Sequence, residues 1–190
     1  SCLEVFRSEG CLSGVKPELL LSLRTNLNGG VRAEEKEERA AFKVEVDRIL
    51  FSDSGAAENF LREYVEPQLK DAKCPYPEVG LLRDDKIFQN VGRSLSIEWL
   101  ERFEDLNIST LETLFEIAAL SSFRERLVVL IRNRCERLMA ESAQEAFSNQ
   151  CKFWFTRAFY FLGFNEVQSY WSWLTKDSNS IFLFDERSRQ

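Results

Sequence analysis

Apolar residues recur along most of this chain at intervals of three or four positions, the spacing that gathers them on one face of an α-helix. One such face is formed by Phe42, Val46, Ile49 and Leu50. Further faces of this kind occur at 60–65, 95–106, 111–118, 127–138 and 167–174. The pattern predicts an all-α fold in which about eight helices form a single irregular multi-helix bundle.

Serine residues that stand three positions before a glutamate predict where the C-terminal helices begin. These pairs are Ser109 with Glu112, Ser122 with Glu125, and Ser142 with Glu145. In such a capping box the two side chains bind backbone N–H groups that the first helical turn leaves without partners. Ser94 or Ser96 is expected to cap the helix before them.

Proline and glycine divide the chain between these helices. The segment 74–77 has the sequence Cys-Pro-Tyr-Pro and cannot continue a regular helix, and Gly80 and Gly92 add further breaks. We therefore expect five parts: a loosely structured N-terminus at 1–16, a helical subdomain at 17–70, an irregular loop at 71–93, a helical bundle at 94–176 and a tail at 177–190.

The C-terminal third is rich in aromatic side chains. Ten of the twenty-one residues from Phe153 to Trp173 are Phe, Tyr or Trp. In the aromatic part of the helix expected at 145–163, from Phe153 onward, only Thr156 and Arg157 leave a polar gap. A helix that is apolar nearly all round is normally enclosed by its neighbours, so we expect this aromatic-rich helix to be central. A groove for a partner and insertion into a membrane are the alternatives.

Four aromatic residues near the C-terminus are the predicted contacts with a partner. They are Trp171, Trp173, Phe182 and Phe184. Trp173 lies off the apolar stripe of the last predicted helix, and the two phenylalanines lie in the polar tail. Because aromatic residues concentrate at the energetic centres of interfaces, we expect these four to be exposed anchors.

Composition removes several classes of chemistry. The 190 residues contain no histidine, which excludes Ser-His-Asp and Cys-His catalysis and histidine metal sites. Five cysteines occur without a Cys-x-x-Cys pair, which favours a reducing, intracellular location in the cytoplasm or nucleus. No charge-free apolar run reaches the length of about 18 residues that a membrane-spanning helix needs. Met139 is the only methionine and does not begin the chain, so we expect part of a longer protein.

The charged residues suggest one candidate anion site. The formal net charge of −6 argues against non-specific binding to phosphate backbones. A local basic face is nevertheless predicted on the helix at 123–140, where Arg126, Arg134 and Arg137 align. Arginine forks suit phosphate or carboxylate, so this face is the candidate site for an anion or a nucleic acid. Pairing of the same arginines with acidic neighbours is the alternative interpretation.

Carboxylates are the remaining candidates for chemistry. The first turns of one predicted helix carry Glu34, Glu35, Glu37 and Glu38. The helix dipole favours negative charge at that end, which makes a solvated helix start the simpler interpretation. Asp84-Asp85-Lys86 after Glu78 is similar to the acidic-x-Lys pattern of metal-dependent nucleases. The chain has no phosphate-binding loop, and its cysteines lack zinc spacing, so we predict no cofactor and no bound metal.

One short motif resembles a known family. Asn90-Val91-Gly92-Arg93 is similar to the Asn-Trp-Gly-Arg core of the first homology motif in Bcl-2-like proteins, which are also all-helical and contain a very hydrophobic helix. Here valine replaces the tryptophan, and the hydrophobic helix comes later in the chain than in that family. The resemblance implies a Bcl-2-like helical regulator as an alternative function.

These observations favour a non-enzymatic helical module for protein–protein interaction, an adaptor or a subunit of a larger assembly. Its expected partner is another protein or a second copy of this chain. The alternatives are a nucleic-acid-associating protein that uses the arginine face, the Bcl-2-like regulator, and a carboxylate- and metal-dependent enzyme.

Overall fold

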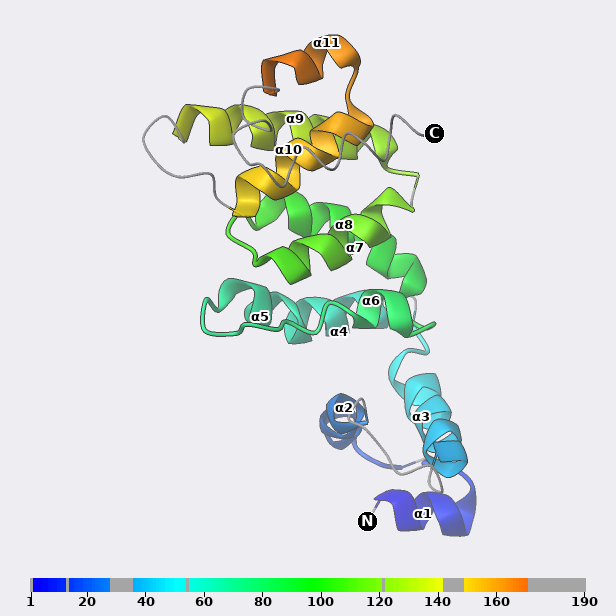
Figure 1. The fold of residues 1–190 in the computed structure, drawn as a ribbon. Helices are drawn as coiled ribbons and strands as arrows, with labels where there is room; N and C mark the ends of the chain where they lie inside the picture. The colour runs from blue at the N-terminus through cyan, green and yellow to red at the C-terminus, as the bar shows by residue number, and fades with distance from the viewer. Residues whose placement is uncertain are drawn as a thin grey trace.

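The computed structural model describes residues 2–12, 14–27, 36–53, 55–120, 122–141 and 149–170. Every regular element within these residues is a helix, which confirms the predicted all-α, multi-helix fold. The helices stack in layers along one direction, with the N-terminus at one end of the stack and α11 at the other (Figure 1). No helix in these ranges combines the length and the apolar character that crossing a bilayer requires.

Three helices form what we call the N-terminal unit. They are α1 (Cys2–Glu9), α2 (Pro17–Asn26) and α3 (Lys36–Leu50). Their small core consists of the buried side chains Leu12, Leu20, Phe42 and Val46. Pro17 is the first residue of α2, as expected, because proline needs no N–H partner there. α1 lies in the segment expected to be loosely structured. The ring of Phe6 packs edge-on against Phe42 at 5.3 Å, a tertiary contact that helical periodicity cannot predict.

The remaining helices form what we call the body. They are α4 (Ala56–Tyr64), α5 (Glu66–Lys70), α6 (Leu81–Asp84), α7 (Gln89–Arg102), α8 (Ile108–Ala119), α9 (Arg124–Glu141), α10 (Asn149–Phe161), α11 (Phe164–Val167) and the 3-10 helix η2 (Gln168–Tyr170). Within it α7 packs mainly on α6 and α8, and α9 packs on α10. α4 and α5 fall within the helical subdomain predicted at 17–70. Their side chains Phe60, Leu61 and Leu69 are buried in the core of the body.

The segment expected to be an irregular loop at 71–93 contains α6 and the start of α7. The two prolines keep the first part non-helical, but Leu82 and Phe88 are fully buried in the body core. Gly92, expected to break a helix, lies inside α7, where α6 comes very close. A Cβ on Gly92 would lie 2.8 Å from the carbonyl oxygen of Leu82. The glycine therefore marks a tight helix crossing rather than a loop.

The predicted serine caps were wrong for α7 and α8. Ser94 and Ser96 lie inside α7, and their hydroxyls donate to the carbonyl oxygens of Val91 and Arg93, each at 2.9 Å. α8 begins at Ile108, one residue before the predicted cap Ser109. The side-chain oxygen of Asn107 accepts the Thr110 N–H at 2.9 Å instead. Asparagine and serine are equally good N-caps, so residue type alone does not choose between Asn107 and Ser109. The third predicted pair, Ser142 with Glu145, lies outside the described residues.

The aromatic helix α10 is enclosed, as predicted. Phe153, Trp154 and Phe155 are all buried, and α10 contacts α8, α9 and α11. Phe115 of α8 packs edge-on against Phe153 at 5.8 Å and against Phe161 at 5.4 Å. An apolar helix surrounded by helices needs no further partner to bury these rings.

A buried ionic cluster joins the N-terminal unit to the body. Arg24 of α2 is fully buried and pairs with Asp47 of α3 and with Asp85, which follows α6. The Lys43 ammonium lies 2.8 Å from the Asp85 carboxylate, and the Arg24 guanidinium lies 5.4 Å from the centroid of the Phe88 ring. Burial raises the pKa of Asp85. The hydrogen bond from Lys43 and the charge of Arg24 lower it by more, so the net shift is downward and the carboxyl group stays ionised.

Candidate functional site

The four predicted anchors Trp171, Trp173, Phe182 and Phe184 lie outside the described residues. The described chain ends at Tyr170, which is buried and stacks on Phe155 at 5.7 Å. The predicted role of these four side chains in partner binding stays a prediction.

The three arginines of the predicted anion site lie on α9 and face the C-terminal end of α7. Arg126 pairs with Glu101 at 2.6 Å, and Arg137 pairs with Glu104. These carboxylates are 25 and 33 residues away in the sequence. Pairing with acidic neighbours was one of the two interpretations of this arginine row. The partners themselves are not predictable from the sequence, because only the packing of α9 against α7 brings them together.

Arg134 differs from the other two because its side chain is buried. One of its terminal nitrogens donates to the Leu100 carbonyl at 2.9 Å and to the Glu101 carbonyl at 3.2 Å. Its other terminal nitrogen lies 2.6 Å from the Glu104 carboxylate. Burial lowers the pKa of Arg134. The guanidinium therefore donates to carbonyl oxygens in the last turn of α7, where the helix dipole favours positive charge.

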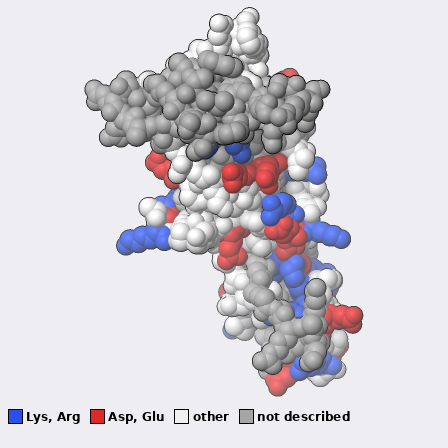
Figure 2. Space-filling model, in the orientation of Figure 1, with Lys and Arg blue, Asp and Glu red and all other residues white. Residues whose placement is uncertain are grey.

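A groove of about 620 Å³ runs along these pairs between α7 and α9. Its lining includes Glu101, Glu104, Arg126, Val129 and Arg134. An anion entering here would have to displace Glu101 or Glu104 from the arginines. Positive and negative side chains also alternate over the middle of the face shown in Figure 2. The described contacts therefore favour a structural role for this arginine row, and nucleic-acid binding stays an untested alternative.

Several of the carboxylates proposed for metal chemistry are engaged, whereas Glu37 is exposed near the start of α3. Glu38 pairs with Arg7 at 2.7 Å, Asp84 pairs with Arg83 at 2.8 Å, and Glu78 accepts the Tyr64 hydroxyl at 2.6 Å. Across the described ranges no three cysteine, aspartate or glutamate side chains gather as a metal ion would require. Glu34 and Glu35 lie outside these ranges.

Sequence reasoning missed the buried carboxylate of Glu66. It accepts hydrogen bonds from the Trp99 indole at 3.1 Å and from Arg102 at 3.0 Å. Arg62 of α4 also donates to Glu66. Its two terminal nitrogens donate to the two carboxylate oxygens of Glu98 on α7, at 2.6 and 2.7 Å. These bonds from Arg62 hold the pKa of Glu98 below its usual range. This network connects α4 and α5 to α7, and its charged side chains are already paired with one another.

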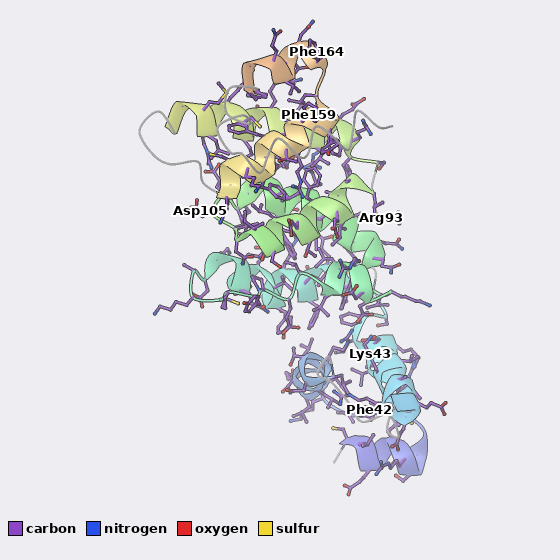
Figure 3. All side chains as sticks on the ribbon, in the orientation of Figure 1. Phe42, Lys43, Arg93, Asp105, Phe159 and Phe164 are labelled. Carbon is purple, nitrogen blue, oxygen red and sulfur yellow. The ribbon has the colours of Figure 1, made fainter. Side chains whose placement is uncertain are left out.

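Large apolar side chains are exposed at several places, among them Tyr76 at 80% and Val44 at 67%, and three more lie on α10 and α11 and directly after α8. The connections α8–α9 and α10–α11 meet in space, since Arg124 at the start of α9 lies 5.4 Å from the Phe161 ring at the end of α10. Leu120 is 81% exposed and Phe164 is 80% exposed. Tyr160 is 41% exposed. Figure 3 shows Phe164 at the outer end of the molecule, on α11. We call Leu120, Tyr160 and Phe164 the apolar end.

Comparisons with protein families, curated proteins and solved structures find no match to this chain.

Proposed function

We propose that this protein is a non-enzymatic helical module that binds another protein through the apolar end. The observation that carries the proposal is the exposure of Leu120 and Phe164, each about four-fifths accessible, beside connections that meet in space. Large aromatic and aliphatic side chains that remain exposed are candidates for a protein interface. The charged groups of the α7–α9 groove, in contrast, pair with one another.

The predicted anchors extend this proposal along the chain. Trp171 follows Tyr170 directly, only a few residues after Phe164 in the sequence. The partner is another protein, or a second copy of this chain if the apolar end binds itself. The role of adaptor or assembly subunit is part of the same proposal.

Site-specific photocrosslinking tests it. A benzophenone amino acid at position 164 should give one discrete protein adduct in extracts of the source cells. The same amino acid at the exposed position Glu136 of α9 serves as the control and should give none. The adduct mass separates a second copy from a different protein, and Leu120→Ser should weaken the adduct. A chain that gives no adduct from positions 120 and 164, and remains monomeric by light scattering at every concentration, would contradict the proposal.

A further inference from the structure

Arg157 has a setting unlike that of the paired arginines in the body. It lies on the aromatic helix α10 and is partly buried. Its guanidinium carbon lies 4.0 Å from the centroid of the Phe153 ring and 5.6 Å from that of Phe115. These phenyl faces hold the guanidinium plane through cation–π attraction.

The hydrogen-bond donors of Arg157 have no acceptor within the described residues. Its contacts there are the two phenyl faces and the more distant charges of Glu112 and Glu116. Burial lowers the pKa of Arg157, and those two carboxylates act in the opposite direction. A guanidinium carries five N–H donors. The nitrogens of Arg157 are not among the fully buried side-chain atoms of the described residues that lack a partner, so the fork remains open to solvent and to a ligand.

The side chain lines a pocket of about 410 Å³ between α8 and α10. Lys152, Asn149 and Thr156 line the same pocket and add an ammonium, an amide and a hydroxyl group. The Phe153 ring supplies an apolar wall, and Glu112 supplies the one carboxylate among the described lining residues. The volume lies in the range of small-molecule sites, which combine apolar walls with a few polar groups.

We propose that this pocket is an oxyanion site in which the Arg157 fork binds a carboxylate or phosphate group. A planar fork already held against Phe153 can bind two oxygens at once without losing much rotational freedom. Lys152 adds positive charge, and Asn149 adds amide donors. Glu112 opposes the ligand, so it sets an upper limit on the affinity. The site does not depend on the apolar end, and either proposal can fail without the other.

NMR titration of the intact chain tests the site with two probes, inorganic phosphate and phenylacetate. The Arg157 Nε–H signal should shift and saturate with at least one of them. Arg157→Lys keeps the charge but loses the fork, and it should weaken binding at least about tenfold, which corresponds to about 1.4 kcal/mol. Glu112→Gln removes a repelling charge and should tighten binding severalfold. Arg93→Lys is the matched control on α7 and should leave the affinity unchanged, because Arg93 is exposed and lies outside this pocket.

The two probes also separate the sources of the ligand. Tighter binding of phosphate points to a phosphorylated ligand, and tighter binding of phenylacetate points to a carboxylate beside an apolar group. Absence of a saturable shift with both probes would overturn the proposal, as would equal affinity in Arg157→Lys. If that variant does not fold, the Arg157 Nε–H signal of the unaltered chain and the Glu112→Gln variant decide the matter.

Discussion

Gly92 shows at the scale of one residue how a sequence motif acquires its meaning from packing. In the Asn-Val-Gly-Arg motif, the glycine lets the Leu82 backbone of α6 come so close to α7 that a side chain at position 92 would collide with it. Its N–H also donates to the Phe88 carbonyl at 2.6 Å, within the first turn of α7. The close approach explains the glycine without reference to the Bcl-2-like family, which remains an untested alternative.

Replacement of Gly92 by alanine is predicted to destabilise the fold. Alanine would favour an isolated helix by up to about 1 kcal/mol, but the clash with the Leu82 backbone should outweigh this gain. We expect a net loss of about 1 to 3 kcal/mol in the free energy of unfolding, measured by urea denaturation.

Gly163→Ala is the matched control for this change. Gly163 has φ −69° and ψ 154°, which alanine adopts freely, and no atom lies closer than 3.9 Å to its added Cβ. Alanine gains up to about 1 kcal/mol through the unfolded state but is a poorer N-cap for α11 than glycine, so the net change should stay below about 1 kcal/mol. Equal effects at both glycines would contradict the packing explanation.

At the scale of the elements, the three arginines of α9 have unequal roles despite their common face. Arg134 is buried and binds two carbonyl oxygens at the end of α7, whereas Arg126 is half exposed and pairs with the half-exposed Glu101. A buried carbonyl that loses its donor costs far more than a surface ion pair that separates. The spacing of the arginines predicts their common face but not this difference.

The prediction at this scale compares two variants of α9. Arg134→Met should lower the free energy of unfolding by about 2 to 3 kcal/mol, because the Leu100 carbonyl loses its donor from Arg134. Arg126→Met should change it by less than about 1 kcal/mol. Parallel urea unfolding curves give both values. Equal small losses would show that the Arg134 bonds do not stabilise the α7–α9 contact.

At the scale of the whole molecule, the ionic cluster around Arg24 connects two groups of helices with separate cores. Figure 3 shows Phe42 and Lys43 on α3, on the side of the junction that belongs to the N-terminal unit. Phe42 belongs to the small core, and Lys43 contacts Asp85 of the body. Removal of one partner from a buried ion cluster leaves the others without compensation, which is strongly destabilising.

Arg24→Met is therefore predicted to loosen the N-terminal unit selectively. We expect amides of α2 and α3 to lose protection equivalent to about 3 to 5 kcal/mol, while amides of α7 and α10 keep most of theirs. Hydrogen exchange is the suitable measurement, because the first fifty residues contain no tryptophan and fluorescence reports only on the rest of the chain. Lys43→Met should have a smaller effect, since that side chain is 29% exposed. Uniform loss of protection throughout the chain would contradict selective loosening.

The sequence by itself determined the helical fold class, the enclosure of the aromatic helix and the alignment of the arginines on α9. These properties follow from the regular spacing of side chains on a helix, which is a local rule. This local rule does not predict which side chains meet at the junction between the two groups of helices or in the candidate sites. Asp47 and Asp85 became partners of Arg24, and Glu101 and Glu104 became partners of the α9 arginines, only through contacts between distant segments.

The tertiary structure also decided where the helices begin and which side chains are exposed. Burial of Leu82 and Phe88 turned part of an expected loop into helix, and Asn107 replaced Ser109 as the cap of α8. Arg157, which the sequence marked only as a gap in an apolar helix, became a cation without an acceptor in the described chain, placed over Phe153. The physical reason is common to these cases. Burial and ion pairing depend on which surfaces meet, and that is a property of the packed molecule rather than of any single helix.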